Sequence, residues 1–258
     1  MKLSVIIPAF RQQKTIIEDL NHIQEILEQL RYDYEMIIVN DGSPDKTFEK
    51  MEQFHESHAK PKSKVKLLSY AKNKGKGHAV RYGMSKATGE YIAFIDSGMD
   101  LNPNGLSMLL EHMEWYKADI VVGSKRHPAS KVEYPPIRRI YSFGYQMMCA
   151  ILFGLNVKDT QTGLKVFRRE VLENVMPRLL IKAWAFDIEM LAVAHHLGYT
   201  KIFEAPIELR HDFGNTSINR RVVLNMLWDT AAVFYRMHIL HYYDESNKEN
   251  WLTNHFDE

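Results

Sequence analysis

Short apolar runs alternate with longer amphipathic segments along the first half of the chain. Runs that suit buried strands cover residues 3–7, 34–39, 65–70, 91–95 and 119–123. The segments between them have helical spacing, as in Ile16 to Leu30, where apolar residues recur every three or four positions. Further helices are predicted over 45–58, from the loop 72–83 to about residue 88, and over 102–116. This alternation predicts an α/β fold with a mostly parallel sheet flanked by helices.

The second half of the chain is less regular. Residues 124–139 are basic and broken by prolines, so a loop is predicted there. An apolar and aromatic helix over 140–155, a strand or turn over 159–169, helices from 170 and over 184–196, a strand over 201–210 and an amphipathic helix over 217–243 follow. No repeat or linker interrupts the chain. We expect one domain over 1–217, with a C-terminal amphipathic helix and tail, 218–258, packed on it.

Composition excludes several classes of protein. Lys and Arg number 33 against 32 Asp and Glu, and this balance gives no support to nucleic-acid binding. Cys149 is the single cysteine, so an internal disulfide and a thiolate zinc site are excluded. Its apolar neighbours favour a packing role for Cys149 over a nucleophilic one.

The chain shows no pattern of a signal peptide or of a membrane-spanning helix. Pro8 interrupts the first apolar run, and no apolar stretch reaches the roughly 18 to 20 residues that a bilayer requires. We therefore expect a cytoplasmic protein, either in solution or peripheral at the cytoplasmic membrane face.

Two carboxylates follow the buried strand over 91–95. Asp96 ends the strand directly, and Asp100 comes four residues later. Ligands of open α/β sheets bind beyond the carboxyl ends of the strands. Asp96 and Asp100 are therefore candidates for holding Mg²⁺ or Mn²⁺ against a phosphate. Helix capping and turn formation around Pro103 is the alternative, and it explains Asp100 better than Asp96.

Two other strand ends carry candidate nucleotide contacts. Asp41 can accept a hydrogen bond from a nucleobase, although an Asx turn or helix cap through Asp45 and Thr47 is the alternative for this segment. In the loop 73–77, two glycines free backbone N–H groups and two lysines add charge at a helix N-terminus, which suits a phosphate. The spacing is not that of a P-loop, and a plain surface loop is the alternative. Arg81 follows in the helix, within reach of the same site.

The second half of the chain offers candidates for the acceptor side. Arg138 and Arg139, in the proline-rich segment, suit recognition of an anionic acceptor, and a solvated charged face is the alternative. Asp187 and Glu189 lie two positions apart, so on a helix they point in different directions. Asp187 is the candidate for a positioning carboxylate or base, and Glu189 for a surface or ion-pair residue. The twelve histidines lack metal-ligand spacing.

Seven motifs occur in an order that resembles the family 2 glycosyltransferases, and most closely their dolichyl-phosphate glucose and dolichyl-phosphate mannose synthase branch. They are SVIIPAF, VNDGSPDKT, NKGKGHAVRYG, YIAFIDSG, VGSKRH, DTQTGLKVFRR and WAFDIE. The resemblance covers roughly residues 3–217, and an ordered set is far more specific than any single motif. It implies a fold of the glycosyltransferase A type, which is a nucleotide-binding α/β domain with a mostly parallel sheet.

The resemblance also suggests roles for individual residues. It implies that Pro8, Phe10 and Asp41 hold the nucleoside, that Gly75 and Lys76 cradle the nucleotide sugar, and that Asp96 is the first acid of a DxD metal motif. The candidate ligands of the nucleotide sugar are Pro8, Ala9, Phe10, Gln12, Asp41, Gly75, Lys76, Arg81 and Asp96. The chain departs from the family pattern at the DxD motif, which reads Asp96-Ser97-Gly98, so Asp100 is the candidate for the second acid.

The implied activity is an inverting transfer of glucose or mannose from a UDP- or GDP-sugar to a polyprenyl phosphate, with Mg²⁺ or Mn²⁺ on Asp96. Such an acceptor is already anionic and needs positioning by Arg138 or Arg139 more than a strong base. A soluble glycan or protein acceptor is one alternative, for which Asp187 would be the base, with its pKa raised by burial. A catalytically silent nucleotide-sugar-binding protein is another, because of the altered DxD. The final helix suits a membrane dock, an oligomer interface or a core helix.

Overall fold

The computed structural model describes residues 2–58, 64–97, 105–130, 136–181, 185–208 and 220–247. Strands of this part of the chain form a seven-stranded sheet in the order β3-β2-β1-β4-β6-β5-β7. They are β1 (Leu3–Ala9), β2 (Tyr34–Asp41), β3 (Val65–Tyr70), β4 (Tyr91–Ile95), β5 (Ile120–Ser124), β6 (Leu164–Arg168) and β7 (Ile202–Pro206). Strand β6 is antiparallel to both neighbours, β4 and β5, and the other paired strands are parallel. The predicted mostly parallel α/β sheet is confirmed.

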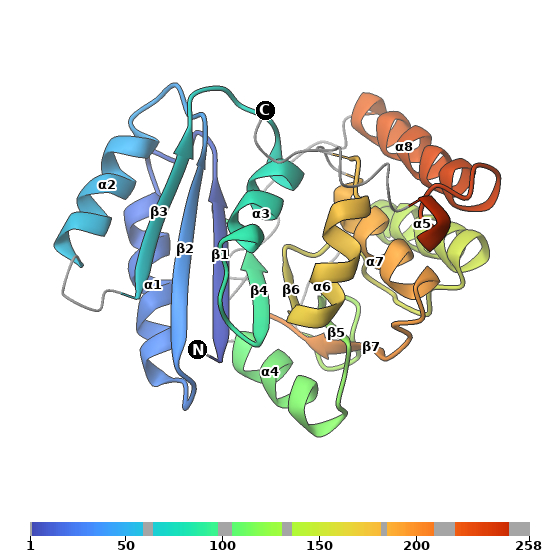
Figure 1. Cartoon of the computed structure of the whole chain (residues 1–258), viewed down its shortest axis with the longest axis horizontal. Helices are drawn as coiled ribbons and strands as arrows, with labels where there is room; N and C mark the ends of the chain where they lie inside the picture. The colour runs from blue at the N-terminus through green and yellow to red at the C-terminus, as the bar shows by residue number, and fades with distance from the viewer. Residues whose placement is uncertain are drawn as a thin grey trace.

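Helices cover both faces of the sheet (Figure 1). They are α1 (Ile16–Gln29), α2 (Thr47–Ser57), α3 (Lys76–Ser85), α4 (Gly105–Trp115), α5 (Pro136–Phe153), α6 (Arg169–Val175), α7 (Phe186–His196) and α8 (Arg220–His238), with 3-10 turns at Met176–Arg178 and Glu245–Asn247. Successive strand residues point to opposite faces. Val5 therefore packs with α1, α2 and α4, and Ile6 packs with α3, α6 and α7.

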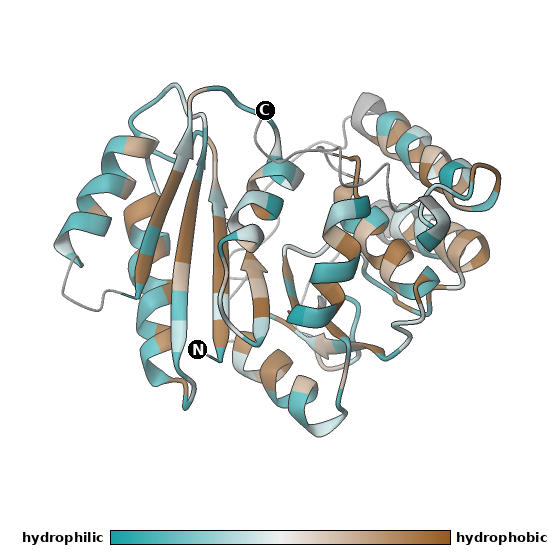
Figure 2. Ribbon diagram, in the orientation of Figure 1, coloured by the Kyte–Doolittle hydropathy of each residue, from teal (hydrophilic) through white to brown (hydrophobic). Residues whose placement is uncertain are grey.

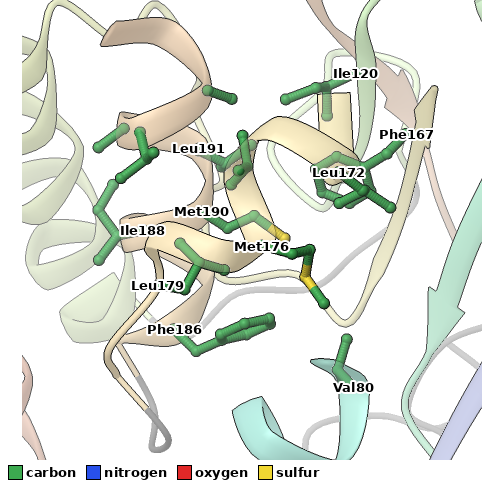
Figure 3. Packing of buried hydrophobic residues seen from close by; sticks show 14 of the residues in the cluster. Val80, Ile120, Phe167, Leu172, Met176, Leu179, Phe186, Ile188, Met190 and Leu191 are labelled. Atoms are coloured by element: carbon green, nitrogen blue, oxygen red, sulfur yellow. The ribbon is translucent and has the colours of Figure 1, made fainter. Parts of the chain in front are cut away.

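The apolar core lies in these two layers. Figure 2 shows hydrophobic residues concentrated on the strands and on the inner sides of the helices. The layer on the Ile6 side is the larger one, and Figure 3 shows how Phe186 and Met190 of α7 lie close to Met176 and to Val80 of α3. Cys149 is fully buried in this layer, and burial raises the pKa of its thiol to about 12, as expected for a packing residue.

Helices α5 and α8 lie side by side beyond α7 (Figure 1). The hydroxyl groups of Tyr145 on α5 and Thr230 on α8 are 3.0 Å apart, and the rings of Phe153 and Phe234 also meet. Helix α5 begins at Pro136, so the loop predicted up to residue 139 is too long. Proline suits the first turn of a helix, where its missing N–H is not needed.

Helix α8 ends at His238, five residues before the predicted end. The backbone of His241 adopts a φ of 49°, which no helix continues through, and the chain then turns back so that Tyr243 is fully buried. No helix within the described ranges is both long and apolar enough to cross a bilayer.

Candidate functional site

A cleft of about 460 Å³ lies at the carboxyl ends of β1, β2 and β4. Its lining residues are Pro8, Ala9, Phe10, Gln12, Asp41, Asn73, Gly75, Lys76, Asp96 and Ser97. The structure therefore brings together all the candidate nucleotide-sugar ligands except Arg81. Their roles toward a ligand stay predictions, but the fold places them around one cavity of a size that suits a small molecule.

Arg81 is not among the residues that line this cleft, and its contact with a nucleotide sugar stays a prediction. Five positions along α3 turn its side chain by about 140° relative to Lys76, which does face the cleft. Arg81 is buried, and burial lowers its pKa although the charge of Glu189 on α7 acts in the opposite direction.

Asp41, at the end of β2, organises the loop that follows β3. Its carboxylate accepts hydrogen bonds from the hydroxyl of Tyr70 (2.8 Å), the side-chain amide of Asn73 (2.8 Å) and the backbone N–H groups of Lys74 (2.8 Å) and Gly75 (3.1 Å). These partners fix the loop whose last residues, Gly75 and Lys76, line the cleft. The contact with a nucleobase remains a prediction, and the arrangement shows a structural role for Asp41 beside it.

The turn after β2 fits closely against that loop. Gly42 has a φ of +59°, and a Cβ atom at this position would overlap the backbone of Lys72 and Asn73. Beyond it, Asp45 accepts hydrogen bonds from the backbone N–H (3.1 Å) and the hydroxyl (2.6 Å) of Thr47. The Asx turn that was the alternative for this segment is therefore present.

Asp96 directly follows β4, and both its side chain and its backbone make hydrogen bonds. The Nζ atom of Lys76 donates to Oδ2 at 2.8 Å, and the backbone N–H of Asp96 donates to the carbonyl of Gly163 at 3.0 Å. A Cβ atom at position 163 would overlap the Asp96 carboxylate, so the close approach depends on glycine. The other oxygen, Oδ1, is buried and accepts no hydrogen bond from the residues that the structure describes.

A buried ion pair lies behind Asp96. Lys165 of β6 has no exposed surface, and its Nζ atom lies 2.6 Å from Oδ1 of Asp187, the second residue of α7. The same ammonium donates to the carbonyl oxygen of Thr162 at 2.5 Å. The second oxygen of Asp187 lies 3.6 Å from Lys76 Nζ. The four side chains thus form a row, in the order Asp96, Lys76, Asp187, Lys165.

The electrostatics of this row contradict the expectation that burial makes Asp187 a base. Burial by itself would raise the pKa of Asp187, but the charges of Lys165 and Lys76 outweigh it and hold the pKa below its usual value. The partner lysines are 22 and 111 positions away along the chain, and local sequence does not reveal them. A carboxylate with a lowered pKa is a poor proton acceptor at neutral pH.

Glu189 is not among the residues that line the cleft; it is buried, so the surface alternative is wrong, and its pairing with Arg236 confirms the ion-pair alternative. It accepts hydrogen bonds from the backbone N–H of Ile181 (2.8 Å) and the hydroxyl of Tyr243 (2.7 Å), and it pairs with Arg236 of α8 at 3.3 Å. Burial raises the pKa of this carboxyl despite these partners. Glu189 therefore ties α7 to the C-terminal segment.

The described side chains of the cleft can supply only some of the ligands that a divalent cation needs. Across the described ranges, no group of three His, Cys, Asp or Glu side chains converges as a metal site. Asp100 lies outside the residues that the structure describes. However, Asp96 Oδ1 is a buried acceptor without a partner in the same part of the chain, and Mg²⁺ commonly binds through one or two carboxylates together with the phosphates of a substrate. The residues present fit a cation shared with a bound diphosphate.

A second cavity, a groove of about 510 Å³, lies between α5 and α8. Its walls are mainly apolar or aromatic residues, and its polar end is formed by Lys125, Lys158 and the segment 159–161. Buried side-chain atoms of Gln146 and Gln161, which line this groove, lack a hydrogen-bond partner within the described part of the chain. The groove thus combines mainly apolar walls with buried polar atoms that have no partner within the described residues.

The segment 159–163 connects the groove to the cleft. Residues 159–161 line the groove. The carbonyls of Thr162 and Gly163 accept hydrogen bonds from the ammonium of Lys165 and from the backbone N–H of Asp96, respectively. Asp159 accepts a hydrogen bond from the backbone N–H of Lys125 at 3.1 Å, which anchors the segment to the residue after β5.

Of the basic residues expected on the acceptor side, Arg138 and Arg139 lie in the first turn of α5, and their side chains are outside what the structure describes. Arg126 has a structural role, because its guanidinium donates to the carbonyls of Lys158 (3.0 Å) and Ser142 (3.3 Å). It ties the segment after β5 to α5 and to the residue that precedes Asp159.

Sequence reasoning gave no role to the side chains of Ser97 and Lys165, and it included Asn73 only as part of the loop 73–77. Asn73 and Ser97 line the cleft, and the Ser97 hydroxyl donates to the carbonyl of Pro8 at 2.5 Å. A signal for Lys165 was present, because a lysine stands there between Leu164 and Val166 in an apolar strand. A charged residue at such a position requires a buried partner.

Comparison with known proteins gives a consistent result. The family model for glycosyl transferase family 2 matches residues 4–176. A dolichyl-phosphate beta-glucosyltransferase of Dictyostelium discoideum is 32% identical over 207 residues, which are 76% of this chain and 63% of that protein. One from Trichomonas vaginalis is 30% identical over 92% of this chain and 75% of its own length, and the human protein is 28% identical over 80% and 65%. The chain thus spans less than two thirds of the Dictyostelium relative.

Solved structures share the architecture. Glucosyl-3-phosphoglycerate synthase of Mycobacterium tuberculosis, in complex with Mn²⁺, UDP and phosphoglyceric acid, aligns with a TM-score of 0.66 at 20% identity, over 91% of this chain and 77% of that one. Mannosyl-3-phosphoglycerate synthase of Rubrobacter xylanophilus aligns with a TM-score of 0.69 at 16% identity, over 92% and 74%. These likenesses show a fold of the glycosyltransferase A type.

Proposed function

The chain belongs to glycosyl transferase family 2, and we propose that it transfers glucose, with inversion, from a nucleoside diphosphate sugar to a polyprenyl phosphate. The observation that carries the proposal is the segment 159–163, which lines an apolar groove with one end and contacts the row around Asp96 with the other. A transferase needs two substrates to meet, and this segment joins two cavities whose size and chemistry suit a donor and a lipid acceptor.

The donor occupies the cleft at the carboxyl ends of β1, β2 and β4. Pro8, Ala9, Phe10 and Gln12 form one wall for the nucleoside, and Asp41 with its loop forms the other. Gly75 is the N-cap residue of α3, so the diphosphate lies at a helix N-terminus beside the ammonium of Lys76. Asp96 would hold a Mg²⁺ or Mn²⁺ ion, whose positive charge would stabilise the departing nucleoside diphosphate.

The acceptor lies in the groove between α5 and α8. Apolar side chains such as Ile140, Val223 and Leu227 suit a polyprenyl chain, and Lys125 and Lys158 suit its phosphate. Arg138 and Arg139, at the start of α5, are proposed to assist in holding that phosphate. The relatives named after dolichyl phosphate support an acceptor of this chemistry.

The state of Asp187 favours a phosphate acceptor over a sugar hydroxyl. A hydroxyl acceptor needs a base, and Asp187 is instead paired with Lys165 and Lys76, which lower its pKa. A phosphate monoester already carries negative charge at neutral pH. Its oxygen can attack the anomeric carbon directly while the bond to the nucleoside diphosphate breaks, so no proton has to be removed.

A peripheral contact with a membrane belongs to the same proposal. Large apolar side chains on the outside of α5 and α8 are exposed, including Ile140 (71%), Ile151 (76%), Leu224 (65%) and Trp228 (78%). Scattered exposed apolar residues are ordinary, but a group of them on two adjacent helices marks an interaction surface. Helices α5 and α8, which carry them, also form the groove, and Ile140 lines it directly, so a lipid could pass from a membrane into the groove.

The test is a transfer assay with purified protein, radiolabelled UDP-glucose or GDP-mannose, Mn²⁺ and a short polyprenyl phosphate. We expect labelled lipid with UDP-glucose and none when the lipid is omitted. Release of UDP with a soluble acceptor but not with polyprenyl phosphate would contradict a lipid acceptor. If UDP binds but no donor is consumed with either acceptor, the chain is a binding protein.

A further inference from the structure

Lys76 is shared by two carboxylates. Its Nζ atom lies 2.8 Å from Asp96 Oδ2 and 3.6 Å from Asp187 Oδ2, so a small movement transfers the ammonium from one to the other. Asp96 faces the cleft with 38% of its side chain exposed, whereas Asp187 is 5% exposed. Lys76 therefore lies between two different carboxylates. Asp96 is the one expected to bind a cation, whereas Asp187 is almost completely shielded from solvent.

Asp187 is in turn held from behind. Lys165 Nζ binds its other oxygen at 2.6 Å and is itself fixed by the Thr162 carbonyl. The ring of Phe94 lies beneath both ammonium groups, 5.6 Å from Lys76 Nζ and 5.2 Å from Lys165 Nζ. Asp187 is thus a rigid, preorganised partner for Lys76.

The row is electrically balanced before any ligand arrives, because its two carboxylates face two ammonium groups. A divalent cation that binds Asp96 alone, through the unpartnered Oδ1, would lie beside the Lys76 ammonium that Oδ2 accepts, and this would leave an excess of positive charge in a partly buried place. A diphosphate that arrives with the cation supplies the missing negative charge and further oxygen ligands. Lys76 then keeps Asp187 as a partner and gains the diphosphate as a new one.

We propose that Lys76 is a built-in counter-ion of Asp96, which releases this carboxylate to a divalent cation only when a diphosphate binds with it, and that the Lys165–Asp187 pair receives Lys76 on release. This rests on the proposed donor site. The chain is thereby protected from loading with metal alone, and metal and nucleotide bind with strong mutual cooperativity.

The experiment measures binding of Mn²⁺ alone, by paramagnetic resonance of the free ion or by calorimetry, with and without UDP. Wild-type protein should bind Mn²⁺ weakly alone and at least about tenfold more tightly with UDP. In Lys76→Met the affinity for Mn²⁺ alone should rise by about tenfold or more, because the competing ammonium is gone, and the gain from UDP should shrink. Lys72→Met, which removes a lysine from the same loop but outside the cleft, should behave as wild type.

Two further variants separate this role from simple phosphate binding. Lys76→Arg keeps the charge and should keep binding of Mn²⁺ alone weak. Lys76→Met/Asp96→Asn should lose the gained affinity, since the released carboxylate is absent. If Lys76→Met weakens UDP binding but leaves the affinity for Mn²⁺ alone unchanged, Lys76 is only a phosphate ligand and the proposal is wrong.

Lys165→Met provides an independent variant. Without Lys165, Asp187 holds only Lys76 and should draw it away from Asp96, so Mn²⁺ alone should bind more tightly although residue 165 never contacts the ion. Unchanged binding in a variant that circular dichroism shows to be folded would contradict the role of the buried pair. These outcomes are distinct from failure of the proposed function, in which neither UDP nor GDP binds wild-type protein with Mn²⁺ present.

Discussion

The ammonium of Lys165 lies 2.6 Å from a carboxylate oxygen of Asp187, and the two side chains are 0% and 5% exposed. A lysine in β6 and an aspartate at the start of α7 thus form an ion pair that water scarcely reaches. Such a pair contributes little net stability compared with apolar residues, but removing one member leaves an unbalanced buried charge.

Asp187→Asn should therefore destabilise the protein by about 3 to 5 kcal/mol, because Lys165 loses the charge that compensates it. Urea unfolding followed by circular dichroism measures this. Lys2→Met is the matched control, because the Lys2–Glu90 pair is exposed (30% and 62%) and should cost at most about 1 kcal/mol. Equal losses in the two variants would contradict a buried, uncompensated charge.

Asp96→Asn should abolish the effect of Mn²⁺ on UDP binding and leave the fold intact. The amide keeps the shape of the side chain but loses the charge that attracts a cation. Calorimetric titration of UDP with and without Mn²⁺ checks the first point, and thermal unfolding checks the second. Glu52→Gln, on the exposed side of α2, removes the same charge far from the cleft and should bind as wild type. An Mn²⁺ effect retained in Asp96→Asn would place the cation elsewhere.

Gly163→Ala should weaken Mn²⁺-dependent UDP binding, because the new Cβ would overlap the Asp96 carboxylate and force it to move. The same titration measures the loss, for which we expect about tenfold or more. Gly144→Ala is the control for stability: its Cβ meets nothing within 4 Å, so alanine in this helix should stabilise by up to about 1 kcal/mol. A Gly163→Ala protein with unaltered binding would show that Asp96 is not held as described.

The buried carboxyl group of Glu35 allows the stability of the protein to be tested at acidic pH. Burial alone would raise the pKa of this carboxyl, but hydrogen bonds from Lys66, Ser4 and Thr88 lower it from 4.5 to about 2. A carboxyl whose pKa is lowered by folding stabilises the protein above the unfolded value, here by up to about 3 kcal/mol, and this stabilisation disappears as the pH falls. The stability difference between wild type and Glu35→Gln should thus be full at about pH 6 and decline between pH 4.5 and about 2. A difference that stays constant over this range would contradict the lowered pKa.

Trp228→Ser/Leu224→Ser should reduce binding to vesicles that contain anionic lipid, because these side chains are prominent in the exposed apolar surface of α8. Flotation of the protein with vesicles measures the change. Trp115→Ser is the matched control, since Trp115 is 83% exposed but lies on α4. Equal loss in the control would show non-specific adsorption, and no loss in the double variant would remove the proposed membrane surface.

The buried strands were predictable from their apolar runs, and the carboxylates of the cleft were predictable from their position at the ends of these strands. A buried parallel strand is a short apolar run, and ligand-binding residues follow its carboxyl end. Asp96 and Asp41 were located in this way, whereas Pro8, Ala9, Phe10 and Gln12, at and just beyond the end of β1, were identified from the resemblance to a family. Each of these residues is close in the sequence to the strand that positions it.

The properties that could not be predicted depend on contacts between distant parts of the chain. The pKa of Asp187 follows from Lys165 and Lys76, which reach it from β6 and α3. The early end of α8 follows from burial of Tyr243 against Glu189. Helical spacing alone did not reveal either contact, because each depends on which elements lie side by side in the sheet and its covering helices.

Strand β6 is antiparallel to its neighbours, and this reversal affects which segments of the protein can vary independently. The segments at the carboxyl ends of the parallel strands β1, β2, β3 and β4 line the cleft, so changing them alters the proposed donor site. In β6 it is the incoming segment, 159–163, that contacts Asp96. An exchange of this short stretch between relatives can therefore change the substrate that approaches from the groove while the nucleotide cradle stays as it is.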